Sequence, residues 1–255
     1  LLNEYGKLKF GSMAMSFGLE NTPKGVLRAF SIVDVDNPKM VQKLTQQGIQ
    51  VMTNYEVGGI KAKTTYEPEA ETYGNRKADV TRLTYEYDKQ TNPFQAQIQS
   101  QINEILYGPD GMVTRTFYTN NVVAQSIGGD KTTAQELLSA MDGKTNAGNN
   151  PAFQVTRKKL LSKANFIGMI DVPGVIASGL DIARQFGPVG QVPFNDNDVK
   201  AIRGEPSYLG TSIAVEGLGL HAKTVVPVQQ MRGIARFVRL MQEIRQEQKN
   251  ADPAF

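Results

Sequence analysis

Runs of alternating apolar and small residues, joined by short turns, constrain this chain more than any other feature. In residues 12–19, Met13, Met15, Phe17 and Leu19 alternate with Ser, Ala and Gly. A period of two is typical of a half-buried strand, so we expect these four side chains to face a buried side together. Further strand-like runs lie at 26–35, 49–54, 60–65, 80–87, 112–118, 122–127, 165–171, 208–215 and 220–228. Because short turns join many of them, antiparallel pairing is favoured.

Segments with apolar residues three and four positions apart lie between these runs and predict helices. They are expected at 38–48, 93–106, 133–141, 151–161, 173–186 and about 229–249. In the last helix, Met231, Ile234, Val238 and Met241 mark the expected buried face. The fold class predicted is α+β, with antiparallel sheets covered by helices.

A polar stretch rich in Gly and Asn, residues 143–150, predicts a flexible loop or linker. It would separate an α+β lobe at 1–142 from a second lobe at 151–255. The alternation in 27–35 recurs in 220–228, and a helix is expected after each run. Two similar lobes and a coincidence of strand composition both remain open as explanations.

Composition removes whole classes of chemistry. The 255 residues include no Cys and a single His, His221, so disulfides, thiolate catalysis, Cys-ligated zinc and sites with two imidazoles are excluded. The net charge of +3 does not indicate a nucleic-acid partner. No apolar stretch approaches the ~20 residues that span a bilayer. We therefore expect no metal, no cofactor and no membrane-spanning segment.

Three short patterns resemble catalytic or binding motifs and fail on their spacing. Residues 128–133 contain Gly, Lys and Thr but lack the two glycines four residues apart of a phosphate loop. Residues 195–198 lack the later Gly and Glu of a calcium loop, so a helix cap or turn is favoured. His221 could act as the base of a serine triad, but the Gly-x-Ser-x-Gly motif of a nucleophile elbow does not occur in the sequence. We expect His221 to be a partly exposed strand residue. The chain is therefore not expected to be an enzyme.

Two clusters of charge are the candidate interaction surfaces. Glu67, Glu69 and Glu71 would share one face of an extended chain, where they either bind a hard cation or form a solvated edge. On the last predicted helix, the cluster is Arg232, Arg236 and Arg239. Its members share a face that either contacts phosphates or lipid headgroups, or is simply solvated.

The layout resembles that of uncharacterised extracytoplasmic envelope proteins of planctomycete and cyanobacterial type. The likeness is carried by Tyr73-Gly74 with Val80-Thr81-Arg82, by Asn150-Pro151-Ala152-Phe153 before the 166–171 strand, and by the ending 220–230. It implies secretion or an envelope location, no known activity and no functional residues to transfer. The chain begins at Leu1 without Met, so we expect this start to follow a processing or truncation point.

These observations favour a non-enzymatic structural or assembly protein of the cell envelope, acting through its surfaces on a protein partner or on itself. The alternative is a carrier that binds an apolar or lipid-like ligand in a pocket lined by methionines, which adapt well to irregular surfaces. A hydrolase that uses a pair of carboxylates is a third and less favoured hypothesis.

Overall fold

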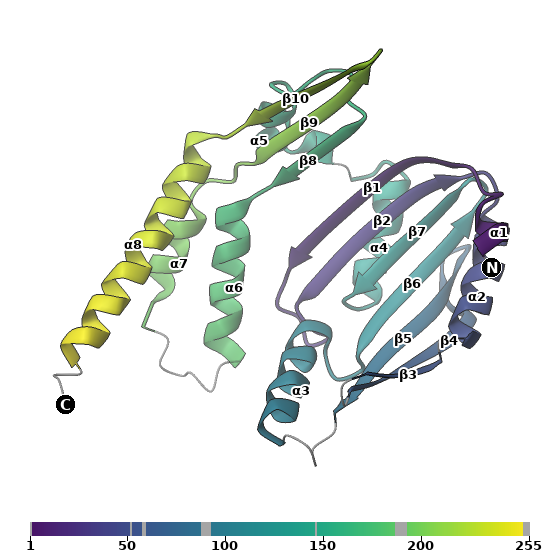
Figure 1. Cartoon of the computed structure of the whole chain (residues 1–255), viewed down its shortest axis with the longest axis horizontal. Coiled ribbons are helices and arrows are strands. Elements are labelled where there is room, and N and C mark those ends of the chain that lie inside the picture. Colours follow the sequence, from purple (N-terminus) through teal and green to yellow (C-terminus); the bar gives the residue numbers. More distant parts are fainter. Residues whose placement is uncertain are drawn as a thin grey trace. The chain divides into compact units, whose positions relative to one another are not determined.

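The computed structural model describes residues 2–51, 53–57, 60–87, 93–145, 147–186 and 193–251. The chain forms two compact units, Leu1–Lys144 and Thr145–Phe255 (Figure 1). The boundary falls inside the segment 143–150, where the linker is expected. The α+β class and the antiparallel sheets predicted from the sequence are confirmed.

The first unit is built on a seven-stranded antiparallel sheet with the order β1-β2-β7-β6-β5-β4-β3 (Figure 1). Its strands are β1 (Phe10–Leu19), β2 (Leu27–Val35), β3 (Asn54–Val57), β4 (Ile60–Tyr73), β5 (Arg76–Tyr87), β6 (Met112–Thr119) and β7 (Val122–Gly128). Its helices are α1 (Leu2–Tyr5), α2 (Pro38–Val51), α3 (Pro93–Tyr107) and α4 (Lys131–Met141).

Two helices cover opposite faces of this sheet. Val123 packs with Leu44 of α2, whereas its neighbour Ala124 packs with Leu137 and Leu138 of α4. Consecutive residues of a strand point to opposite faces, so α2 and α4 must lie on different sides. The core under α4 is centred on Phe117, which is fully buried.

The second unit contains a three-stranded antiparallel sheet with the order β10-β9-β8. Its strands are β8 (Phe166–Ile170), β9 (Leu209–Glu216) and β10 (Gly219–Val225), and its helices are α5 (Pro151–Arg157), α6 (Val172–Phe186), α7 (Asp196–Arg203) and α8 (Val228–Ala251), with a 3₁₀ turn at Ala147–Asn149. Ala177, Val199 and Ile202 form its buried cluster, against which Phe237 and Leu240 of α8 pack.

A hairpin followed by a helix recurs four times within the described residues. The four occurrences are β1-β2-α2, β4-β5-α3, β6-β7-α4 and β9-β10-α8. The two similar runs at 27–35 and 220–228 each contain the second strand of such a hairpin, β2 and β10. Both runs thus occupy the same place in a local topology that the chain uses repeatedly.

Several predicted element boundaries are wrong. The helix predicted at 151–161 ends at Arg157, and the strand predicted at 60–65 continues to Tyr73. A strand is predicted at 49–54, but α2 continues through Gly48 to Val51 and β3 begins only at Asn54. A glycine inside a helix costs only about 1 kcal/mol, which packing of the helix on the sheet can outweigh. The helix predicted to begin at Thr133 begins at Lys131, because the Asp130 side chain accepts hydrogen bonds from the amides of Thr132 and Thr133.

Among the residues that the structure describes, none of the helices combines the length and apolar character that crossing a bilayer requires.

Candidate functional site

Strand β1 lies at one end of the seven-stranded sheet and exposes the row of side chains that the sequence predicts to be buried. Met13, Met15 and Phe17 are 66%, 70% and 67% exposed, and Phe10 is also exposed. The alternation correctly predicts a strand, but the expectation of burial is wrong. The reason is that, among the residues that the structure describes, β1 pairs with β2 alone and lies beyond the areas that α2 and α4 cover.

The ten residues of β1 include no charged side chain and no proline. Natural edge strands are usually short, charged, bulged or proline-containing, since an unpaired strand edge is a template for another chain. The other sheet edges follow this rule: β3 has four residues including Glu56, β8 has five residues, and β10 carries Lys223. The only protective feature of β1 is a bulge at its start, and its register with β2 is regular from Met13 to Leu19.

The three glutamates at 67–71 do not share one face, contrary to the sequence-based expectation. The register between β4 and β5 shifts between Glu67 and Glu71, and Glu69 adopts a positive φ of 50°. The bulge turns Glu71 inward while Glu67 and Glu69 stay exposed, paired with Arg82 at 3.3 Å and with Lys77 at 2.5 Å. These carboxylates therefore do not converge, and no group of acidic or His residues within the described ranges is arranged to hold a metal ion.

Glu71 forms a buried ion pair that sequence reasoning missed. Its carboxylate lies 2.7 Å from Nε of Arg115 on β6, and the hydroxyl of Tyr73 donates a hydrogen bond to it. Burial disfavours the charged carboxylate, but the hydrogen bonds from Arg115 and Tyr73 outweigh it, so the pKa of Glu71 lies below its ordinary value. One local feature of the sequence indicates such a pair. Arg115 occupies a position of β6 that the alternation of side chains assigns to the buried face, where an arginine needs a partner.

A second buried carboxylate, Asp79, holds the bulge of β4 in place. It accepts hydrogen bonds from the Tyr66 hydroxyl, from Nε2 of Gln42 at 2.9 Å and from the amide of Glu69 at 2.8 Å. Burial and the hydrogen bond to Asp79 raise the pKa of Tyr66. Because Asp79 is saturated by these donors, its role here is to fix the strained backbone at Glu69.

The arginines of α8 have different surroundings. Nη1 of Arg236 donates to the carbonyl oxygen of Ala201 in α7 at 2.5 Å. Arg232 and Arg239 are exposed, and no ion pair is recorded for either within the described part of the chain. The three therefore do not form one free cationic face.

The buried face of α8 also differs from the prediction. Of the four residues predicted to be buried, Ile234 and Met241 are half-buried, but Met231 and Val238 are exposed. The buried residues of the helix include Gln230, Gly233 and Ile244. Gln230 makes several hydrogen bonds there: its Nε2 donates to the Ser207 carbonyl at 2.7 Å and to the Asp171 carboxylate at 3.0 Å.

The weak motifs take structural roles. Asn195 caps α7 and forms a capping box with Asp198, as the sequence predicts. His221 lies exposed on β10, opposite Ala214.

No family model matches this sequence, and no curated protein or solved structure is significantly similar to it. The functional argument therefore depends on the surfaces and contacts of this chain.

Proposed function

We propose that this chain is a non-enzymatic assembly protein that associates with a second copy of itself through strand β1. The single observation that carries the proposal is the uncharged, proline-free edge of β1 with its exposed apolar row. Such an edge offers backbone donors and acceptors together with apolar side chains, and it lacks the features that normally prevent pairing.

The composition of β1 suits pairing with itself. In a two-fold antiparallel arrangement centred on Met15, Met13 of each copy lies opposite Phe17 of the other. No like charges would face each other, because the strand is uncharged. A two-fold axis is the commonest symmetry of protein assemblies, and it would join two seven-stranded sheets through their β1 edges.

The alternative, a carrier with a methionine-lined pocket, has weaker support. Met13 and Met15 lie on an exposed edge. The pocket found in the first unit is lined by charged side chains, glycines, a valine and a tyrosine, with no methionine. Self-association, unlike a closed pocket, requires Met13 and Met15 to be exposed, as they are.

An extracytoplasmic or envelope location is part of the proposal and is supported only by the resemblance in layout. Fractionation of the producing cells with an antibody against the chain tests it, and recovery in the cytoplasmic fraction would contradict it.

The association is tested by light scattering coupled to size-exclusion chromatography on three proteins. The unaltered chain should have the mass of a dimer. Met15→Lys should be monomeric, because pairing would place two lysines opposite each other. The matched control is Leu220→Lys, since Leu220 is also 70% exposed but lies on β10; this variant should remain a dimer.

Two results would overturn the proposal. One is a monomeric unaltered chain at tens of micromolar. The other is a dimer that survives Met15→Lys or that Leu220→Lys disrupts equally, since association would then use another surface.

A further inference from the structure

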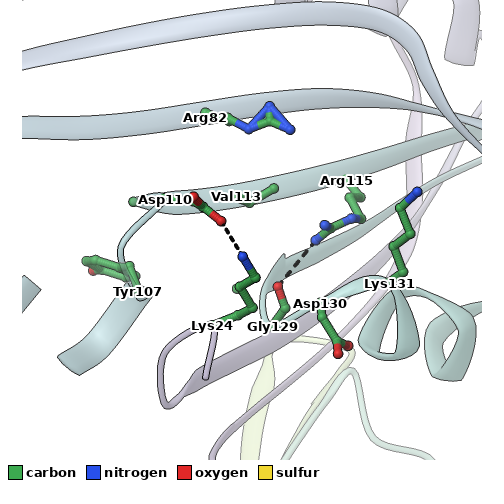
Figure 2. A pocket seen from close by; sticks show the side chains of 11 residues that line it. Lys24, Arg82, Tyr107, Asp110, Val113, Arg115, Gly129, Asp130 and Lys131 are labelled. Atoms are coloured by element: carbon green, nitrogen blue, oxygen red, sulfur yellow. Dashed lines mark hydrogen bonds and ion pairs between the residues drawn. The ribbon is translucent and has the colours of Figure 1, made fainter. Parts of the chain in front are cut away.

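A pocket of about 190 Å³ in the first unit brings together four cationic side chains from four separate segments (Figure 2). Lys24 comes from the turn between β1 and β2, Arg82 from β5, Arg115 from β6 and Lys131 from the start of α4. No sequence pattern connects these residues, because only the sheet topology makes them neighbours.

The lining of the pocket carries a positive net charge. Two carboxylates, Asp110 and Asp130, lie among the four cations, so the lining has a formal charge of +2. A hydrogen bond from Lys24 lowers the pKa of Asp110. Burial opposes ionisation of Asp130, but backbone amides outweigh it and lower its pKa. Both carboxylates are therefore ionised at neutral pH. The lining itself keeps its charge of +2, while Glu71 and Glu67, which lie outside the lining, pair with Arg115 and Arg82.

The cations differ in how firmly they are held. The Arg115 side chain is only 8% exposed, and its contacts to Glu71 and to the Gly129 carbonyl fix the guanidinium. Arg82 makes a 3.3 Å contact with exposed Glu67, and such surface pairs contribute little. Lys131 is exposed, and no ion pair is recorded for it within the described residues. Lys24 is held by a 2.6 Å ion pair with Asp110 (Figure 2). The pocket thus has two cations that are fixed by their partners, Arg115 and Lys24, and two that can turn toward a ligand, Arg82 and Lys131.

The start of α4 does not itself provide the anion site. The carboxylate of Asp130 already accepts hydrogen bonds from the Thr132 and Thr133 amides at 2.8 and 3.3 Å. The amides that would bind a phosphate at a free helix start are therefore occupied. Any affinity for an anion has to come from the lysine and arginine side chains.

We propose that this pocket binds a phosphate group. A phosphate group carries close to two negative charges at neutral pH, so the cations that line the pocket attract it, above all Lys131, which has no ion pair recorded within the described residues. Arginine guanidinium groups suit its oxygens geometrically, and lysines add point charges. The volume of about 190 Å³ is below the 300–1,000 Å³ typical of sites for larger ligands, which suits a group as small as a phosphate. The site is built from side chains, which is consistent with the failure of residues 128–133 to match a phosphate loop.

Titration calorimetry with inorganic phosphate against chloride, at constant ionic strength, tests the proposal on the full chain. The unaltered protein should bind one phosphate with a dissociation constant in the millimolar range or below. Lys131→Ala and Arg82→Gln should each weaken binding by roughly three- to tenfold, because each removes one partly exposed charge-assisted contact. Asp110→Asn should tighten binding, because it removes a negative charge from the lining.

Lys39→Ala is the matched control, since Lys39 is likewise an exposed lysine in the first turn of a helix, α2. It should leave phosphate binding unchanged. No saturable binding at millimolar phosphate overturns the proposal. Equal effects of the two lysine variants would show that general surface charge is responsible, and they overturn it too.

Two further arms identify the source of the phosphate group. A soluble phosphate monoester is titrated in the same way, and phosphatidylcholine vesicles with and without phosphatidic acid are tested for co-sedimentation. Binding of the monoester that is weakened by Lys131→Ala indicates a free phosphorylated molecule. Binding to the phosphatidic acid vesicles with the same dependence on Lys131 indicates a lipid headgroup. If inorganic phosphate alone binds through Lys131, the free ion is the ligand; if none of the three binds through Lys131, the proposal is overturned.

Discussion

Removing the Glu71 carboxylate should destabilise the first unit far more than removing its exposed neighbour Glu67. In Glu71→Ala, the Arg115 guanidinium stays buried and loses its only carboxylate partner recorded in the described residues. The Tyr73 hydroxyl loses its acceptor as well. A charge that remains buried without its partner costs about 3–5 kcal/mol, much more than the intact pair contributes.

The lower end of that range applies here, because Arg115 also lines a pocket that water can enter. A loss of about 3 kcal/mol should lower the melting temperature of a unit of this size by roughly 6–12 °C. Thermal unfolding of the full chain followed by circular dichroism measures this shift. Glu67→Ala removes an exposed 3.3 Å pair and should change stability by less than about 1 kcal/mol.

Replacing both partners separates the buried charge from the loss of packing. Glu71→Ala combined with Arg115→Met leaves no unpaired charge, so this double variant should be at least as stable as Glu71→Ala alone. If Glu71→Ala melts within about 2 °C of the unaltered chain, or if Glu67→Ala is equally damaging, the burial and pairing assigned to Glu71 are wrong.

Further predictions concern the core, the turn geometry, acid stability and α8. Phe117→Ala should lower the free energy of unfolding in urea by about 3–5 kcal/mol, whereas Phe17→Ala should change it by less than about 0.5 kcal/mol at concentrations where the chain is monomeric; the opposite ranking would contradict the assigned faces. Gly128→Ala should lower the melting temperature by a few degrees, since φ is 72° there and a Cβ would collide with the backbone of β2. Because the pKa of folded Glu71 lies below its ordinary value of 4.5, its contribution is complete above that pH and is lost as the pH falls through the folded value. Unfolding measured from neutral pH into acid should therefore show a smaller loss of stability for Glu71→Gln than for the unaltered chain. Arg236→Ala should cost about 1 kcal/mol in chemical unfolding, because it removes a hydrogen bond to the carbonyl end of α7; no change would show that this contact contributes nothing.

The sequence predicts the strands and hairpins well, because their alternation and turn residues are local signals. The hairpin through Asn120 and Asn121 occurs between β6 and β7 as expected. The strand at 165–171, the helix from Pro173 and the cap at Asn195 also lie where their local patterns indicate. Each of these signals depends on residues only a few positions apart.

Burial of β1 could not be predicted from its own residues. The alternation shows that Met13, Met15 and Phe17 share a face, but a covering layer depends on which strand lies next in the sheet. The order places β7, distant in sequence, beside β2 and leaves β1 at the end. Pairing between strands that are distant in sequence therefore determines whether β1 is covered. The same pairing brings together the residues of the cationic pocket.

The glutamates at 67–71 show how one irregular residue changes a whole pattern. Period-two reasoning holds only while the backbone stays extended. The segment after Pro68 bulges, Glu69 takes a positive φ, and Asp79 accepts its amide hydrogen bond. The partner that stabilises this bulge lies on the next strand, so the three carboxylates carry no local sign that Glu71 turns inward.

Helix α8 illustrates the difference between predicting an element and predicting its contacts. Its length and amphipathic character are evident, but apolar residues occur around much of its circumference, so the sequence permits more than one buried face. Gln230 and Gly233 select among them. Gly233 is needed because a Cβ there would overlap Pro173 of α6, and Gln230 is buried because it hydrogen-bonds to Asp171 and Ser207. A polar residue and a glycine thus define the packed face, while Met231 and Val238, chosen by hydrophobicity, remain exposed. Close approach of helices and satisfaction of buried polar groups outweigh the burial of two more apolar side chains, and neither can be read from apolar spacing alone.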